Sequence, residues 1–139
     1  MTSRHFEPIL DKSGEIIEWL MSSSDMPSDL DLAFKIRLAV EEAVVNIVSY
    51  AYHDGTGYVE VGTERSSDNI LTIVFKDAGT PFNPLEKPMP DIDLPAKDRP
   101  VGGLGIYLCH KMMDELSYAY VDGCNVFTMK KNLNPVAHA

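Results

Sequence analysis

The sequence predicts an α+β fold, a two-layer sandwich in which three helices cover one face of a mixed, mostly antiparallel sheet. Three observations support this fold class. Two pairs of strand-like segments each flank a short polar turn, three segments carry helical signals, and the order along the chain is β-α-α-β-β-loop-α-β-β. Helices that lie together on one face of such a sheet would bury its apolar side.

Length and composition predict one domain over residues 1–139, because 139 residues with 45% hydrophobic content suffice for a single packed core. No run of about eighteen apolar residues is present, and the N-terminus lacks the apolar region of a signal peptide. We therefore expect a cytoplasmic protein without membrane contact. The net charge of −9 argues against nucleic acid as a direct partner. An anionic ligand would need local donors, such as backbone N–H groups, a helix N-terminus or a bound cation.

The N-terminal half is predicted to contain a strand and two helices. The segment "RHFEPIL" is typical of a short first strand, and Ser13 can cap the first helix. Ser28 and Asp31 form an S-x-x-D capping box. This box predicts a second helix that continues to about Tyr52, where "HDGTG" ends it. Because this helix is apolar nearly all round, we expect it to be largely buried.

The C-terminal half is predicted to contain two hairpins and a third helix. "YVEVGTE" and "ILTIVF" flank the turn "SSDN", and the second of these strands should lie centrally in the sheet. Residues 84–101 contain five prolines and no periodicity, as do functional lids or disordered segments. An apolar series from Ile106 to Leu116 then predicts the third helix. "SYAYV" and "NVFTMKK" flank Asp122-Gly123, a pair that suits a tight hairpin turn.

Three polar residues interrupt the apolar second helix, where polar groups need a partner. Arg37 lies four residues before Glu41, which fits an ordinary ion pair. Glu42 and Asn46 share a helix face with no basic residue between them. They form either a solvated edge or a buried hydrogen-bonded pair, or else a carboxylate and an amide that face a hydrated metal ion.

Two glycine-containing segments could meet a ligand. Asp77 ends the central strand and Gly79 follows it; this is either a plain turn or a strand-end carboxylate that accepts a hydrogen bond from an exocyclic amine. Gly102, Gly103 and Gly105 open the third helix. They form either a flexible hinge with an irregular cap or a helix N-terminus whose backbone N–H groups approach a phosphate closely.

The order of these motifs resembles the GHKL superfamily of ATPases, which share the Bergerat ATP-binding fold. "EEAVVN" matches its N box, "DAGTPF" its first glycine box and "GGLGIYL" its second. The resemblance extends from about Ser28 to Leu133. Within the superfamily, the short chain and the segment "GGLGIYLCHKMMDELSYAYVDGCNVFTMKK" are similar to the bacterial anti-sigma-factor serine kinases.

The resemblance implies a role for each matching residue. Asn46 would ligate Mg²⁺, which bridges the ATP phosphates, and Glu42 would be the general base or would orient the attacking hydroxyl. Asp77 would bind the adenine amino group, with Gly79 keeping the floor of the pocket open. Residues 84–101 would form the ATP lid. The phosphates would be bound by Gly102 and by the backbone N–H groups of Gly103, Leu104 and Gly105. The lid could supply the cations Lys87, Lys97 and Arg99.

The implied function is that of an ATP- and Mg²⁺-dependent protein serine/threonine kinase. It would phosphorylate a STAS-type anti-sigma antagonist and sequester a sigma factor, and so regulate transcription through a partner switch. One alternative is a non-catalytic ATP/ADP-binding module that sequesters a partner, and another is a stand-alone histidine-kinase-type ATPase domain. The resemblance also implies a homodimer, whose surface could lie on the first helix or on the outer face of the sheet.

The sequence departs from the family pattern in the first glycine box, where Thr80-Pro81 follow Gly79 in place of a second glycine. The adenine-side residue of the last strand is open as well, because Asn125 and Thr128 are both candidates.

Overall fold

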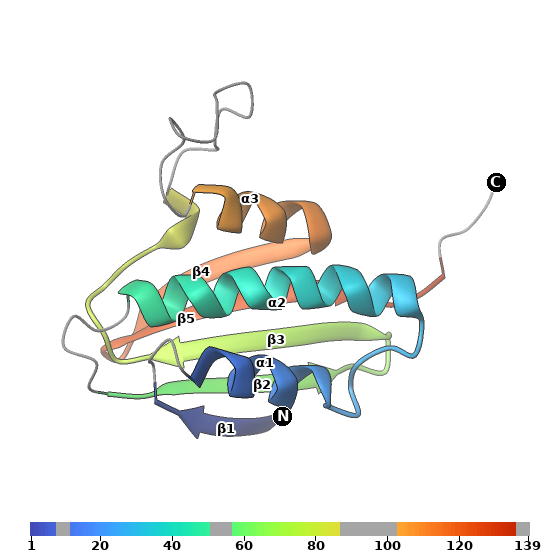
Figure 1. The fold of residues 1–139 in the computed structure, drawn as a ribbon, viewed down its shortest axis with the longest axis horizontal. Helices are drawn as coiled ribbons and strands as arrows, with labels where there is room; N and C mark the ends of the chain where they lie inside the picture. Colours follow the sequence, from blue (N-terminus) through green and yellow to red (C-terminus); the bar gives the residue numbers. More distant parts are fainter. Residues whose placement is uncertain (8–11, 51–56, 87–102, 136–139) are drawn as a thin grey trace.

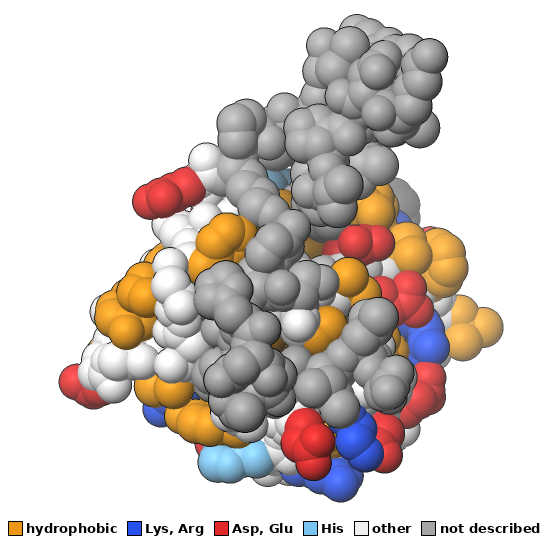
Figure 2. Space-filling model, turned by 60° about the vertical axis from the view of Figure 1, so that its left-hand side comes forward, with side chains coloured by type: hydrophobic (Ala, Val, Ile, Leu, Met, Phe, Trp, Pro, Cys, Tyr) orange, Lys and Arg blue, Asp and Glu red, His pale blue; other side chains and the backbone are white. Residues whose placement is uncertain are grey.

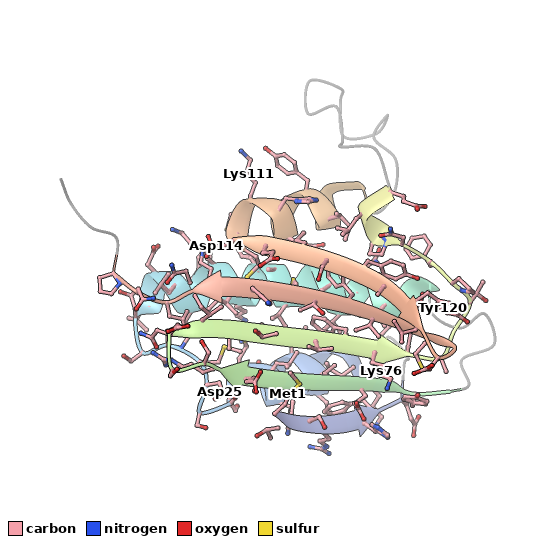
Figure 3. All side chains as sticks on the ribbon, turned by 180° about the vertical axis from the view of Figure 1, so that it is seen from behind. Met1, Asp25, Lys76, Lys111, Asp114 and Tyr120 are labelled. Atoms are coloured by element: carbon pink, nitrogen blue, oxygen red, sulfur yellow. The ribbon has the colours of Figure 1, made fainter. Side chains whose placement is uncertain are left out.

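The computed structural model describes residues 1–7, 12–50, 57–86 and 103–135. Within these ranges, one five-stranded sheet carries three α-helices on one face, which confirms the predicted fold class (Figure 1). Figure 3 shows the opposite face of the sheet, from which Lys76 projects, with no helix in front of it. The elements in chain order are β1 (Thr2–Phe6), α1 (Ser13–Met21), α2 (Leu30–Tyr50), β2 (Val59–Arg65), β3 (Ile70–Asp77), the 3₁₀ turn η2 (Pro84–Glu86), α3 (Gly103–Met112), β4 (Glu115–Val121) and β5 (Cys124–Asn132).

The strand order is β1-β2-β3-β5-β4, so β3 is central, as its apolar sequence predicts. Every pairing among the described strands is antiparallel, whereas a mixed, mostly antiparallel sheet was expected. The last hairpin enters the sheet with its second strand against β3, which leaves β4 at the edge. Asp77 of β3 therefore lies directly opposite Asn125 of β5, although the two are far apart in sequence.

The core lies between the sheet and the helices. Burial alternates strictly along β3, so that Leu71, Ile73, Phe75 and Asp77 face the helix layer. Apolar residues of α1 and α2 pack onto this face, and α3 packs against α2. Asp77 thus ends a buried apolar row and carries a carboxylate into the helix layer.

The predicted caps of the first two helices are partly wrong. Asp29 caps α2, because its Oδ1 accepts a hydrogen bond of 3.0 Å from the backbone N–H of Leu32. The cap is therefore one residue later than the Ser28 and Asp31 box predicts. Ser13 is the first residue of α1, and the preceding Lys12 makes no side-chain capping bond.

Several predicted boundaries also shift. The first strand ends at Phe6, earlier than "RHFEPIL" predicts, and residues 8–11 and 51–56 lie outside the described part of the chain. The third helix ends at Met112, and Leu116 belongs to β4, because a new strand begins at Glu115. The Asp122-Gly123 turn is confirmed: both residues have positive φ, as a tight primed turn requires. Most of the predicted lid at 84–101 lies outside the described residues, and its start forms η2.

The most exposed large apolar side chains on a helix are on α2, where Leu30 is 86% exposed and Phe34 61% exposed. On the strands, Val121 of β4 is 50% exposed, so the dimer surface expected on the first helix or the outer sheet face stays a prediction. None of the helices in the described ranges is both long and apolar enough to cross a bilayer.

Candidate nucleotide site

A pocket opens at the end of the sheet where β3 stops and β5 starts, under the C-terminal half of α2 (left in Figure 1). It has about 360 Å³ of empty space, including its open mouth. Its wall is mostly apolar, and the polar side chains in it are Asn46, Asp77 and Asn125. The apolar lining residues are Ile47, Phe75, Phe82, Pro84 and Phe127. A mainly apolar hollow with a few convergent polar groups is the usual form of a small-molecule site.

Asp77 presents its carboxylate at the base of this pocket and is only 5% exposed. Its Oδ1 accepts hydrogen bonds from the backbone N–H of Gly79 at 2.9 Å and from Nδ2 of Asn125 at 3.0 Å. The bond to Gly79 closes the turn that the D-x-G pattern predicts. The predicted turn is therefore confirmed, and the same residue lines a pocket.

Asn125 and Thr128, the two candidates on the last strand, lie on different faces of the sheet. Alternation along β5 turns Asn125, Phe127 and Met129 toward the helix layer, whereas Thr128 lies on the outer face of the sheet. Asn125 is 6% exposed and lines the pocket. Thr128 therefore cannot face the pocket, and Asn125 is the candidate that remains.

Asn46 and Glu42 lie one turn apart on α2, and the structure separates them from Glu41. Glu41 pairs with Arg37 at 3.0 Å, as predicted. Asn46 lines the pocket beside Asp77, and no hydrogen bond joins its amide to another described side chain. Glu42 is half-buried and is not among the residues that line the pocket.

Glu42 lies close enough to Cys109 of α3 for its charge to act on the thiol. Burial and, to a lesser extent, the charge of Glu42 together raise the pKa of the Cys109 thiol to about 12. Cys109 in turn donates a hydrogen bond of 3.4 Å from its Sγ to the carbonyl oxygen of Ala39. The Cys109 thiol is therefore neutral and belongs to the packing of α3 against α2, beside the predicted base.

The second glycine motif opens α3, as predicted. Gly103, Leu104 and Gly105 are the first residues of this helix, and Gly102 lies outside the described part of the chain. The first N–H groups of any helix lack an intrahelical partner, and its N-terminus carries partial positive charge. His110 and Lys111 occupy the last turn, where positive charge suits the helix dipole. The predicted lid cations Lys87, Lys97 and Arg99 lie outside the described residues.

The start of α3 and the end of α2 lie at the same end of the molecule as the pocket (Figure 1). Figure 2 brings this end forward and shows acidic side chains scattered beside hydrophobic ones. No group of three or more His, Cys, Asp or Glu side chains in the described ranges could hold a metal ion by itself. On a chain with a net charge of −9, an anion bound here would depend on backbone N–H groups and on a cation that it brings with it.

The sequence profile of the histidine kinase-like ATPase domain matches residues 14–131. This chain belongs to that family. The match spans the N box on α2, the pocket and α3, and it confirms the resemblance to the GHKL superfamily that the motifs indicate.

Curated relatives of this histidine kinase-like ATPase domain include enzymes named serine-protein kinase RsbW. The protein of that name from Bacillus thuringiensis (strain Al Hakam) is 31% identical over 99 residues, which cover 68% of this chain and 61% of the relative. The one from Bacillus anthracis (strain CDC 684 / NRRL 3495) is 32% identical over the same shares of the two chains. The matched region thus spans about three fifths of the relatives' length.

Solved structures with the same fold include a blue-light activated histidine kinase from Erythrobacter litoralis EL346. It superposes with a TM-score of 0.59 at 16% identity and covers 89% of this chain and 40% of its own. The histidine kinase domain of the same protein gives a TM-score of 0.55 at 15% identity and covers 87% of this chain and 57% of its own. At these identities the likeness concerns the fold alone.

Proposed function

We propose that this chain is a single ATPase domain over residues 1–139 that binds ATP with Mg²⁺ and acts as a serine/threonine protein kinase of the anti-sigma-factor type. The observation that carries the proposal is the buried Asp77 carboxylate in an apolar pocket, next to Asn46 and inside the matched ATPase region. The serine-protein kinases among the relatives support the kinase assignment.

The adenine base would enter the pocket from its open mouth. Its exocyclic amine would donate a hydrogen bond to the carboxylate of Asp77, and the rings would lie against the apolar wall that includes Phe82 and Ile47. Two donors already hold this carboxylate, so it would be in position before the base binds. Gly79, whose N–H is one of those donors, would keep the floor of the pocket open.

The phosphates would extend toward α3, where the backbone N–H groups of Gly103, Leu104 and Gly105 open the helix. Gly102 would let the chain approach them closely. The amide oxygen of Asn46 would be a ligand of Mg²⁺, a hard cation that prefers oxygen and needs few protein ligands when phosphates supply the rest. No hydrogen bond within the described ranges holds the side chain of Asn46 at the pocket, which fits this role. When bound, Mg²⁺ would neutralise charge on the phosphate oxygens.

Glu42 would act on the hydroxyl of the protein substrate. Its carboxylate would take the proton of a serine or threonine, whose oxygen then bonds to the γ-phosphorus as the bond to the bridging oxygen of ADP breaks. Glu42 is better suited than Glu41, because Glu41 is held in an ion pair with Arg37. The segment 84–101 would form the ATP lid, with Lys87, Lys97 and Arg99 as its cations.

The protein substrate would be a STAS-type anti-sigma antagonist, and the unoccupied kinase would sequester a sigma factor, so that phosphorylation regulates transcription. A homodimer is part of the same proposal. Sedimentation velocity at micromolar concentration would test the dimer, and a single species of monomer mass would contradict it.

One observation favours a second candidate, a non-catalytic ATP/ADP-binding module that sequesters a partner: Glu42 does not line the pocket. A stand-alone histidine-kinase-type ATPase domain is the third candidate, supported by fold alone. The chemistry of the product separates them. A kinase of the anti-sigma type would form acid-stable phosphoserine or phosphothreonine, the third candidate would form acid-labile phosphohistidine, and the second would transfer nothing.

The experiment incubates the protein with γ-labelled ATP, Mg²⁺ and a STAS-type antagonist encoded beside its gene. Glu42→Gln should lower phosphoryl transfer by about 10²- to 10⁴-fold, the usual contribution of a general base, while the dissociation constant for ATP changes only a few-fold. Glu41→Gln, one residue away on the same helix, is the matched control and should transfer phosphate at the wild-type rate. Equal transfer by wild type and Glu42→Gln would remove Glu42 from the mechanism.

A further inference from the structure

Asn125 uses its whole hydrogen-bonding capacity around the pocket. Its Nδ2 donates to Oδ1 of Asp77 at 3.0 Å and to the carbonyl oxygen of Thr80 at 3.0 Å. Its Oδ1 accepts the backbone N–H of Phe82 at 3.0 Å and the hydroxyl of Tyr118. An amide has two donor hydrogens and two acceptor lone pairs, so the side chain is fully occupied.

A longer bond of 3.4 Å from Nδ2 to the carbonyl oxygen of Gly79 adds a fifth partner to these four, and together they fix the orientation of the amide. A carboxylate such as that of Asp77 can only accept hydrogen bonds, and so can the carbonyl oxygen of Thr80. The N–H of Phe82 can only donate. Rotating the amide by half a turn would place an oxygen against two oxygens and a nitrogen against an N–H. Asn125 therefore presents its donor side to Asp77 in one defined way.

The partners of Asn125 include two different residues of the pocket lining. Asp77 supplies the polar group at its base, and Phe82 supplies part of its aromatic wall. The stretch between them, Thr80-Pro81, is where the sequence departs from the glycine-rich pattern of its superfamily. A hydrogen-bonded side chain from β5 holds this stretch on both sides of Pro81.

Tyr118 lies behind Asn125 on the neighbouring strand β4. Burial raises the pKa of the Tyr118 hydroxyl, a backbone hydrogen bond from Phe82 lowers it, and the charge of Asp77 raises it again. The net pKa is above the ordinary value, so the hydroxyl keeps its proton at neutral pH and continues to donate to Asn125.

We propose that Asn125, supported by Tyr118, is a positioning residue that holds Asp77 and Phe82 together and thereby makes the pocket select a purine with an amino group at C6, as in adenine, over one with a carbonyl group there, as in guanine. The proposal rests on the proposed nucleotide-binding function. Asn125 does not touch the base itself, because none of its polar atoms is free. It acts by keeping the acceptor of Asp77 and the ring of Phe82 in the relative positions that one base can use.

The most specific variant is Asn125→Asp, which replaces the donor to Asp77 by a second carboxylate. Two carboxylates about 3 Å apart cannot both ionise easily, so one proton is held to a higher pH than usual. Below that pKa the pair would share a proton and restore an O–H donor between the two residues. Ionisable groups near the pair in the described part of the chain include Tyr118, on which Tyr120 and Glu86 act through their charges.

We expect Asn125→Asp to bind ATP about tenfold or more weakly than wild type at about pH 8 and to lose its preference over GTP, since a misplaced buried carboxylate costs about 1–3 kcal/mol. The affinity and the preference should return as the pH falls to about 5, where the shared proton restores the donor. Tyr118→Phe keeps the ring and removes the hydroxyl, and it should weaken ATP binding by about threefold.

Two matched controls lie on the same strands. Thr128→Val is on β5 and Ser117→Ala is on β4; these two residues pair with each other and face the outer side of the sheet. Both should keep wild-type affinity and the same ratio of ATP to GTP binding at both pH values. A merely structural role of Asn125 would lower the affinity for ATP and GTP alike and would show no recovery at low pH.

A second readout does not need nucleotide. The Phe82 amide, which donates to Asn125, should exchange its hydrogen about tenfold faster in Asn125→Asp at about pH 8 than in wild type, after correction for intrinsic rates. An unchanged Phe82 rate, or an unchanged ratio of ATP to GTP binding, would overturn the proposal. If wild type binds no purine nucleotide, the proposed function fails and base selection fails with it, while the Phe82 rate separately reports whether Asn125 holds this segment.

Discussion

Replacing Asp77 by Asn tests the adenine contact with little change of shape. In the wild type, one carboxylate oxygen accepts the Gly79 N–H and the Asn125 Nδ2. The amide oxygen of the variant can keep both bonds. Hydrogen bonds to a charged acceptor contribute about 1.5–3 kcal/mol each and neutral ones about 0.5–1.5, so weakening two bonds should cost about 2–3 kcal/mol of stability. The protein should therefore remain folded.

In Asp77→Asn, the NH₂ group of the amide replaces the second carboxylate oxygen, so a donor takes the place of an acceptor. It would meet the exocyclic amine of adenine, which also donates, and a donor left without a partner costs about 1–3 kcal/mol. The dissociation constants of ATP and ADP should therefore rise alike, by about 5- to 150-fold. The affinity for GTP should rise or stay constant, because the carbonyl oxygen of guanine can accept from the new donor.

Isothermal titration calorimetry with ATP, ADP and GTP measures both changes, and thermal unfolding measures the loss of stability. Asp114→Asn is the matched control. Its Oδ2 also accepts a backbone N–H, from Asn132, but at the opposite end of β5. An unchanged preference for ATP over GTP in Asp77→Asn, with the protein folded, would refute the assignment of Asp77 to the base.

Three further predictions follow from single contacts. Asn46→Ala should abolish the Mg²⁺-dependent part of ATP binding, while the melting temperature stays near that of wild type. Calorimetry with and without Mg²⁺ measures this, and an unchanged Mg²⁺ dependence in the variant would show that Asn46 is not a ligand. The pKa of Cys109 is about 12 in the folded protein and about 9 in the unfolded chain, so unfolding above about pH 9 releases a proton. The free energy of unfolding should therefore fall by up to about 1.4 kcal/mol per pH unit between these two values. Cys109→Ser, whose hydroxyl can still donate to the carbonyl oxygen of Ala39, should show a smaller fall in urea titrations. Asp29→Ala should cost about 1 kcal/mol of stability through the lost helix cap, whereas Ser28→Ala should cost almost nothing, and equal losses would restore the capping box.

Local patterns predicted the fold class, because strand alternation, turn residues and apolar helices are set by neighbouring residues. Asp77 could be placed at a strand end for the same reason. The choice between Asn125 and Thr128 could not be made, since it depends on which face of β5 meets the helices. That face is fixed by the pairing of Asp77 with Asn125 across the sheet, a contact between distant segments.

The contacts that sequence reasoning missed are also non-local. Nothing in "SYAYV" distinguishes Tyr118 from Tyr120, yet only Tyr118 donates to Asn125. Phe82 becomes part of the pocket because its backbone is held by β5. The shift of the helix cap from Ser28 to Asp29 has a simpler cause. Both residue types can cap a helix, and the local sequence does not decide at which of two adjacent residues the helix begins.

The central claim is that the pocket between Asp77 and the start of α3 binds an adenine nucleotide. Titration of the ¹⁵N-labelled protein with ATP and Mg²⁺ tests it most directly. The account predicts saturable shifts of the backbone amides of Gly79, Phe82 and Gly105, while the amides of Val74 and Thr128 on the outer face of the sheet stay in place. The absence of saturable shifts, or shifts centred on that outer face, would contradict the claim.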